Sequence, residues 1–393
     1  MLSPTGSERL PSLTGLRFLL AACVLMAHAL SGSAIFSERP QAVLSVAAAP
    51  VATSAVSGFF VLSGFVLAWS YRPGDRARAF WRRRFWKIYP NHALGWVLGA
   101  LFFVVATAPS PMAVGGSATV LGGAAELFLL KVWAPVPEAF NGFNDPSWSV
   151  CCEAFFYLLF PVLIPAARRL TRTGLRCAWL ALACAILMFP ALAMALGGRA
   201  LPGWPLGLNA LWFGYVFPPV RLTEFMLGMV TARLVQEGAW PRLNAPIRIG
   251  FLAAVLAATP FVPLTYCLGA SYGLPFSLIV AGLAVRDVQG RSRLLARPAM
   301  VALGEASYAL YIVHFPLLMS ARQAVGVNHR FAVLNGVLFA VGLMVAAQVV
   351  ALLVHRRYER PIQARFARGT RAVSSGRLER SAVPVSDQLM VSE

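Results

Sequence analysis

The stretch RFLLAACVLMAH, Arg17 to His28, is an apolar, helix-forming run with an arginine at one end and a histidine at the other. In an α-helix each residue turns by about 100° and rises by about 1.5 Å. His28 therefore returns to within roughly 20° of the Arg17 face, about 16 Å further along the axis. Two polar groups on one stripe of an apolar helix must face something other than lipid, because ionisable side chains in hydrocarbon are costly.

The composition of the chain is that of an integral membrane protein. Its 393 residues are 58% hydrophobic and 12% charged, whereas soluble domains carry about 25% charged residues. Since a helix needs about 20 apolar residues to cross a bilayer, the apolar runs predict an all-α bundle of about ten transmembrane helices. These spans are expected near residues 13–32, 48–70, 89–107, 149–166, 177–197, 209–235, 249–266, 272–285, 298–320 and 331–354.

The net charge of +19 is explained by membrane topology rather than by a nucleic-acid partner. With a cytoplasmic N-terminus, most of the 34 Lys and Arg lie in loops on the cytoplasmic side. This asymmetry follows the positive-inside rule and predicts N- and C-termini that are both cytoplasmic. The expected outer loops hold only Arg39, Lys131, Arg199, Arg322 and Arg330.

One membrane domain, residues 1–366, is predicted to precede a Ser- and Arg-rich tail, residues 367–393. The tail is expected to be disordered and cytoplasmic, because it has too few apolar residues to bury a core. The six cysteines have no metal-ligand spacing, so we expect neither a disulfide framework nor a metal site. The sequence carries no signal for the oligomeric state.

A basic loop, FWRRRFWKIYP at residues 80–90, follows the second expected span. Its cations include Arg83, Arg84 and Lys87, interleaved with aromatic residues. Arginine pairs with phosphate oxygens through two parallel hydrogen bonds, so the loop is a candidate phosphate-binding site. The alternative is that it is a topology signal that contacts anionic lipid headgroups.

Three titratable residues, His28, Glu153 and His314, are expected at one level in the outer half of the membrane. A histidine oriented by a carboxylate is a common general base, so Glu153 is a candidate partner of His28. The alternative is that each histidine is satisfied by a carbonyl of a neighbouring helix.

Other polar residues in or beside expected spans allow structural as well as functional interpretations. Arg221 and Glu224 are three residues apart on one helix, where an internal ion pair can form. Trp148 fits an aromatic belt at the membrane interface. The remaining candidates are Ser149 at the start of the fourth span and Glu305, Ser307 and Tyr308 on the ninth.

Seven segments in this order resemble the membrane acyltransferase 3 family of bacterial O-acyltransferases. They are LTGLRFLLAACVLMAH, FFVLSGFVL, RRFWKIYP, PSWSVCCEAFFYLLFP, VRLTEFMLGM, GEASYALYIVHFPLL and YERP. The resemblance covers about residues 10–365, and Lys87 stands where the family usually has arginine. Lysine keeps the positive charge but cannot form the two-pronged arginine contact.

The resemblance implies a multi-pass enzyme of the bacterial inner membrane that uses cytoplasmic acyl-CoA, with acetyl-CoA as the expected donor. No permanently bound cofactor is expected. The acceptor would be a carbohydrate hydroxyl of an envelope glycan, such as lipopolysaccharide, or of a secreted glycoside, modified at the outer side. A transporter or flippase for a lipid-linked glycan is the alternative, because it also needs buried charges in a helical bundle.

The resemblance and the helix geometry together give each candidate residue an expected role. His28 is the expected general base, oriented by Glu153. An alternative is that His28 is acylated first and then passes the group on. Trp148 and Ser149 are candidates to stabilise the oxyanion. Arg17, Arg83, Arg84 and Lys87 are expected to bind the donor, and Arg221, Glu224, Ser307, Tyr308 and His314 to contact substrate or support the structure.

Overall fold

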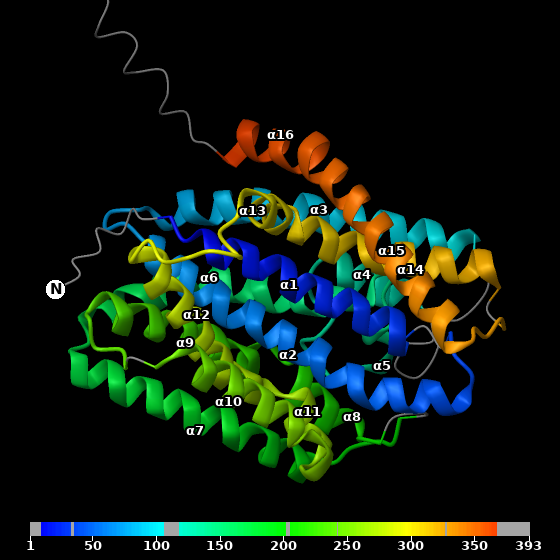
Figure 1. The fold of residues 1–393 in the computed structure, drawn as a ribbon, viewed down its shortest axis with the longest axis horizontal. Coiled ribbons are helices and arrows are strands. Elements are labelled where there is room, and N and C mark those ends of the chain that lie inside the picture. Colours follow the sequence, from blue (N-terminus) through cyan, green and yellow to red (C-terminus); the bar gives the residue numbers. More distant parts are fainter. Residues whose placement is uncertain are drawn as a thin grey trace, which may run out of the picture.

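The computed structural model describes residues 9–32, 35–105, 118–201, 205–241, 243–326 and 328–367, so nearly all of the predicted tail lies outside the described residues. The described chain forms helices and no β-strand (Figure 1). The α-helices are α1 (Pro11–Ala27), α2 (Glu38–Ser70), α3 (Ala77–Val105), α4 (Val120–Leu127), α5 (Pro137–Phe140), α6 (Trp148–Arg169), α7 (Arg172–Leu196), α8 (Leu208–Leu211), α9 (Pro218–Gln236), α10 (Ala245–Ala257), α11 (Leu264–Leu268), α12 (Gly273–Val288), α13 (Pro298–Glu305), α14 (Ser307–Val325), α15 (Val333–Val354) and α16 (Arg360–Ile362).

Within the described residues, six helices are long and apolar enough to cross a membrane. The pair α13–α14, bent by 58°, makes a seventh if it counts as one span. The all-α membrane fold is thereby confirmed, but the expected number of ten spans is not. Part of the difference has a physical cause: α9 carries Arg221, Glu224 and Arg233, and the apolar segment Ala245–Phe261 is short for a crossing.

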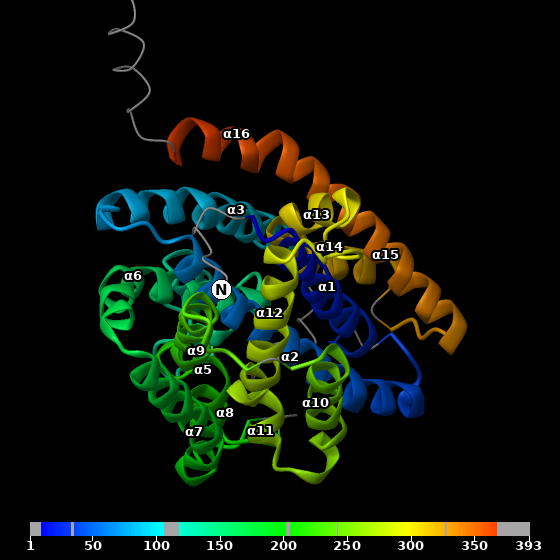
Figure 2. The ribbon, with the colours of Figure 1, turned by 60° about the vertical axis from the view of Figure 1, so that its left-hand side comes forward.

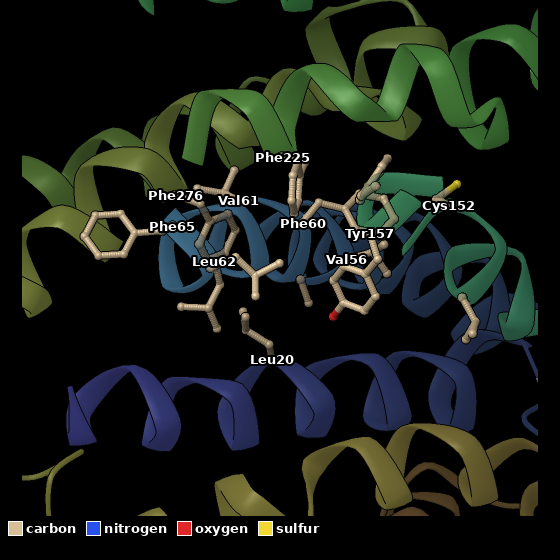
Figure 3. Close-up of a cluster of buried hydrophobic side chains, with 14 of the residues drawn as sticks. Leu20, Val56, Phe60, Val61, Leu62, Phe65, Cys152, Tyr157, Phe225 and Phe276 are labelled. Atoms are coloured by element: carbon tan, nitrogen blue, oxygen red, sulfur yellow. The ribbon is translucent and has the colours of Figure 1, made fainter. Parts of the chain in front are cut away.

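Helices α1 and α2 form the centre of the bundle (Figures 1 and 2). Helices α3 and α14 lie on one side of them, and α7, α9 and α10 on the other. A cluster of buried apolar side chains fills the space between α1, α2 and α9, with Leu20 and Phe225 at opposite sides and Phe60 between them (Figure 3). This packing fixes α1, and with it the stripe that carries Arg17 and His28.

Two glycines allow α2 and α9 to approach closely. A methyl group at Gly64 would collide with the carbonyl of Phe225, and one at Gly228 with the carbonyl of Val61. Small residues at such contacts let helix backbones pack directly against each other in membranes.

We expect Gly228→Ala to destabilise the protein by about 1–3 kcal/mol, because the added methyl group overpacks a backbone contact that cannot relax locally. Thermal unfolding in detergent measures the effect. Gly250→Ala on α10 is the matched control, since a methyl group there meets no atom within 4 Å. Equal midpoints for the two variants would show that the contact between α2 and α9 tolerates separation.

The first turn of α1 is fixed from a distant part of the chain. The carboxylate of Asp287, at the end of α12, accepts hydrogen bonds from the Ser12 backbone N–H at 3.0 Å and from the Ser12 hydroxyl at 2.7 Å. A carboxylate at a helix N-terminus accepts hydrogen bonds from the free N–H groups there. Its negative charge also interacts favourably with the positive end of the helix dipole. Asp287 therefore anchors the end of α1 that precedes Arg17.

Candidate functional site

A partly open cavity lies between α1, α2, α3, α6 and α14, with about 770 Å³ of space when the solvent at its mouth is included. Three of the predicted donor-binding residues line it: Arg17 from α1 and Arg84 and Lys87 from α3. Most of the remaining wall is apolar or aromatic and includes Val56 and Phe60, which Figure 3 shows on the face of α2. Cations beside an apolar wall suit a ligand with an anionic head and a long, weakly polar arm.

The adjacent residues Arg83 and Arg84 have different environments. Arg84 lines the cavity, and its guanidinium lies over the rings of Phe80 and Tyr157 at 5.5 and 5.7 Å. Arg83 does not line the cavity; it pairs with Asp75 in the turn before α3. This departs from the expected set of four donor-binding cations, because neighbouring positions on a helix point about 100° apart.

Glu153 does not have the partner expected from the sequence. Its carboxylate accepts hydrogen bonds from the hydroxyls of Tyr157, one helical turn later on α6, and of Ser63 on α2, the latter at 3.4 Å. Glu153 also lines the same cavity as Arg17 and Lys87. The structure therefore corrects the pairing of Glu153 with His28 and places the carboxylate among the cations instead.

The hydrogen-bond partner of His28 is His314 on α14. Their facing nitrogens, Nδ1 of His28 and Nε2 of His314, are 2.9 Å apart. His28 begins a π-helical turn, His28–Gly32, that interrupts the regular helix at the end of α1. His314 is buried, and its Nδ1 lies 2.5 Å from the carbonyl oxygen of Tyr311.

Tyr311 stands between the cavity and this histidine pair. Its side chain lines the cavity, whereas neither His28 nor His314 does, and its ring centroid is 5.6 Å from that of His314. Its hydroxyl donates to the carbonyl of Pro146 at 3.1 Å and lies 2.7 Å from the hydroxyl of Ser149. Ser149 also lies 3.0 Å from the Pro146 carbonyl, so two hydroxyl protons serve these three contacts.

Arg221 and Glu224 form an ion pair outside the cavity. The Nε of Arg221 is 3.0 Å from a carboxylate oxygen of Glu224, and both side chains are 0% exposed. Arg221 also donates to the Ser57 hydroxyl at 3.1 Å, and its guanidinium lies over the rings of Phe60 and Trp148. The expected internal ion pair is therefore present, and Trp148 packs against it and does not line the cavity.

The residues predicted on the ninth span lie in two different environments, some at the cavity and one at the surface. Ser307 and Tyr308 line the cavity, and the Tyr308 hydroxyl donates to the carbonyl of Ile88 at 2.9 Å. Tyr308 thereby ties α14 to α3 one residue after Lys87. Glu305 is exposed at the bend between α13 and α14.

Sequence reasoning missed a buried polar cluster in the segment between α3 and α6. Glu126 is fully buried and accepts hydrogen bonds from the backbone N–H groups of Phe143 and Asn144, at 2.7 and 3.1 Å. The ammonium of Lys131 lies 3.8 Å from carboxylate oxygens of both Glu126 and Asp145. Burial raises the pKa of the Glu126 carboxyl, and the Lys131 charge opposes that rise. The only signal was a pair of opposite charges in the apolar run ELFLLKVW.

A second missed cluster joins the end of the chain to α3. Glu359 accepts hydrogen bonds from Asn91 at 3.0 Å and from Gln363 at 2.9 Å, and it lies 3.1 Å from Nδ1 of His355. The Trp86 and Phe366 rings stack at 4.5 Å. These contacts hold the helix that carries Arg84 and Lys87. The YERP segment is the sequence signal for this cluster.

The described residues contain no group of three His, Cys, Asp or Glu side chains able to hold a metal ion. Cys151 and Cys152 at the start of α6 are both buried and unbonded to each other.

Two comparisons with known proteins indicate the same enzyme class. A family model described as an acyltransferase domain matches residues 10–356. Acyltransferase MdmB of Streptomyces mycarofaciens is 35% identical over 365 residues, which cover 91% of this chain and 92% of that protein. Nodulation protein 10 of Rhizobium leguminosarum bv. viciae is 26% identical over 300 residues, covering 69% of this chain and 73% of the relative. No solved structure matches the chain significantly.

Proposed function

Because this chain belongs to the acyltransferase 3 family and is an acyltransferase, we propose that it moves an acyl group, acetyl in the simplest case, from acyl-CoA to a carbohydrate hydroxyl. The observation that carries the proposal is the arrangement along α1. Arg17 lies in a cation-lined cavity, and His28 lies about 16 Å further along the same helix face.

The donor is proposed to enter the cavity from the cytoplasmic side. Its phosphates would meet Arg17, Arg84 and Lys87, since charge-assisted contacts to phosphate are the strongest hydrogen bonds available there. The apolar wall that includes Val56 and Phe60 would hold the pantetheine arm and direct the thioester toward α14. Glu153 balances the cations while no donor is bound.

The reaction is proposed to take place at the histidine pair. The acceptor oxygen attacks the thioester carbonyl carbon as His28 takes the hydroxyl proton. The carbon–sulfur bond breaks, the new carbon–oxygen bond completes the ester, and the CoA thiolate receives the proton from His28. The net products are the acylated acceptor and CoA, with His28 returned to its starting state.

The acceptor and the location are inferred from chemistry and from the relatives. A sugar hydroxyl is a weak acid and needs a base such as His28. The relatives are bacterial, which supports a place in the bacterial cytoplasmic membrane, with acyl-CoA supplied inside and an envelope glycan or secreted glycoside met outside.

Thermal unfolding in detergent tests the donor site without knowledge of the acceptor. Acetyl-CoA and CoA are each expected to raise the midpoint of the purified protein, because a ligand that binds only the folded state stabilises it. Arg17→Ala is expected to remove most of the shift. Arg82→Ala is the matched control, since Arg82 is exposed and does not line the cavity.

Two results would overturn the donor assignment. The first is a folded protein whose midpoint moves with neither acetyl-CoA nor longer acyl-CoAs. The second is an Arg17→Ala variant that keeps the full shift. The first result favours transport of a lipid-linked glycan, which needs buried charges but no CoA site.

A further inference from the structure

The backbone carbonyl of Tyr311 determines which nitrogens of the histidine pair donate hydrogen bonds and which accept them. The Tyr311 carbonyl can only accept, so Nδ1 of His314 carries a proton and donates to it at 2.5 Å. In neutral His314 the other nitrogen, Nε2, then has a free lone pair and is an acceptor. Nδ1 of His28, 2.9 Å away, must therefore be the donor of the second hydrogen bond.

We infer that His314 is a positioning residue that fixes the tautomer of His28, with the proton on Nδ1 and the basic lone pair on Nε2. This inference rests on the proposed function, because it assigns the atom of His28 that takes the acceptor proton. It adds a role for His314 in which the residue touches neither donor nor acceptor.

The ring geometry supports a hydrogen bond between the two histidines. The two imidazole planes are within 5° of parallel, with centroids 5.2 Å apart. A nitrogen–nitrogen distance of 2.9 Å is shorter than the contact between stacked rings, so the rings meet edge to edge, as a hydrogen bond requires. The ring of Phe315 packs edge-on against His28 at 6.3 Å and limits its rotation.

In this arrangement a second histidine takes the place of the carboxylate that commonly orients a catalytic histidine. In hydrolases a carboxylate holds the catalytic histidine in the required tautomer. Here, among the described residues, neither histidine is hydrogen-bonded to an Asp or Glu, and Glu153 is bonded to Ser63 and Tyr157 instead. A neutral imidazole, itself fixed by the Tyr311 carbonyl, provides the acceptor for His28 Nδ1–H.

Nitrogen NMR of histidine-labelled protein tests the tautomer directly. The chain has five histidines, and the His28 signals are identified by their loss in His28→Gln. In wild type, Nδ1 of His28 is expected to be protonated and Nε2 unprotonated at neutral to alkaline pH. In His314→Leu the fixed tautomer is expected to give way to a mixture. The opposite tautomer in wild type would overturn the inference, whatever the activity of any variant.

Kinetics provide the second measurement, with radiolabelled acetyl-CoA as donor and the glycan and glycolipid fraction of bacterial membranes as acceptor. His314→Leu is expected to lower kcat by about 10–100-fold, the range found when a metal-bound histidine loses its orienting partner, with an unchanged KM for acetyl-CoA. His314→Gln is expected to recover part of the loss, because its amide oxygen offers an acceptor. His329→Leu, at an exposed position, is the control.

The possible outcomes distinguish failure of the proposed function from failure of the positioning role of His314. Wild type without acetyl transfer, and without a midpoint shift with acetyl-CoA, contradicts the proposed function, while the NMR result still decides the tautomer. An active wild type with an undiminished kcat in His314→Leu overturns the positioning role. If His314→Leu does not fold, the comparison rests on His314→Gln and on the wild-type spectrum.

Discussion

His28→Ala is expected to reduce acetyl transfer by about 10²–10⁴-fold, the range that a general base contributes. The loss should appear in kcat, because the proposed donor contacts come from Arg17, Arg84 and Lys87 and remain in place. Transfer of radiolabelled acetyl to the membrane glycan fraction measures the rate. The midpoint shift with acetyl-CoA shows in the same preparation that the variant folds and binds donor.

Cys23→Ala is a suitable control, because Cys23 lies on the same helix and does not line the cavity. Near-normal turnover in His28→Ala would refute the role of His28. Covalent radiolabel on the protein, captured without acid treatment, is not expected if the acceptor attacks the thioester directly. Label that appears on wild type without acceptor, and disappears in His28→Ala, would instead support an acyl-histidine intermediate.

Breaking the Arg221–Glu224 pair is expected to cause the largest loss of stability. Arg221→Met or Glu224→Leu alone leaves one charge buried without its partner, which costs about 3–5 kcal/mol in the free energy of unfolding. Arg221→Met combined with Glu224→Leu removes both charges and should recover most of that loss, since apolar replacements of a buried pair are often neutral or stabilising.

Denaturant unfolding of the two single variants and the double variant in detergent closes a double-mutant cycle. A coupling free energy near zero would show that the pair does not stabilise the bundle. A double variant that regains stability but transfers no acetyl would indicate a direct part in the reaction. On the present structure we expect it to stay active, because neither residue lines the cavity.

The helical fold and the family were predictable because both depend on local sequence. Helix-length apolar runs predict an all-α membrane protein, and the spacing of Arg17 and His28 follows from helix geometry alone. The number of spans was less predictable, because buried charges such as Arg233 lower the hydropathy of α9 without preventing it from packing inside the bundle.

The pairing of side chains from different helices was not predictable. Assigning Glu153 to His28 assumed that equal depth in the membrane means contact. The actual partners depend on how α6 is rotated toward Ser63, and on the π-helical turn that begins at His28. The cluster around Glu126 was missed for the same reason, since it brings together residues from a loop whose path no periodic pattern describes.

The contacts of Tyr311 with Pro146 and Ser149 also matter for keeping the membrane impermeable to ions. An enzyme that receives a water-soluble donor from one side and an acceptor from the other must not let ions pass between the two half-sites. The Tyr311 ring lines the cavity on one side and lies beside His314 on the other, and its hydroxyl is held by two hydrogen-bonding contacts. Under the proposed function, Tyr311 would close the passage between the two half-sites except when the thioester reaches His28, and so would limit the loss of the electrochemical gradient of the cell.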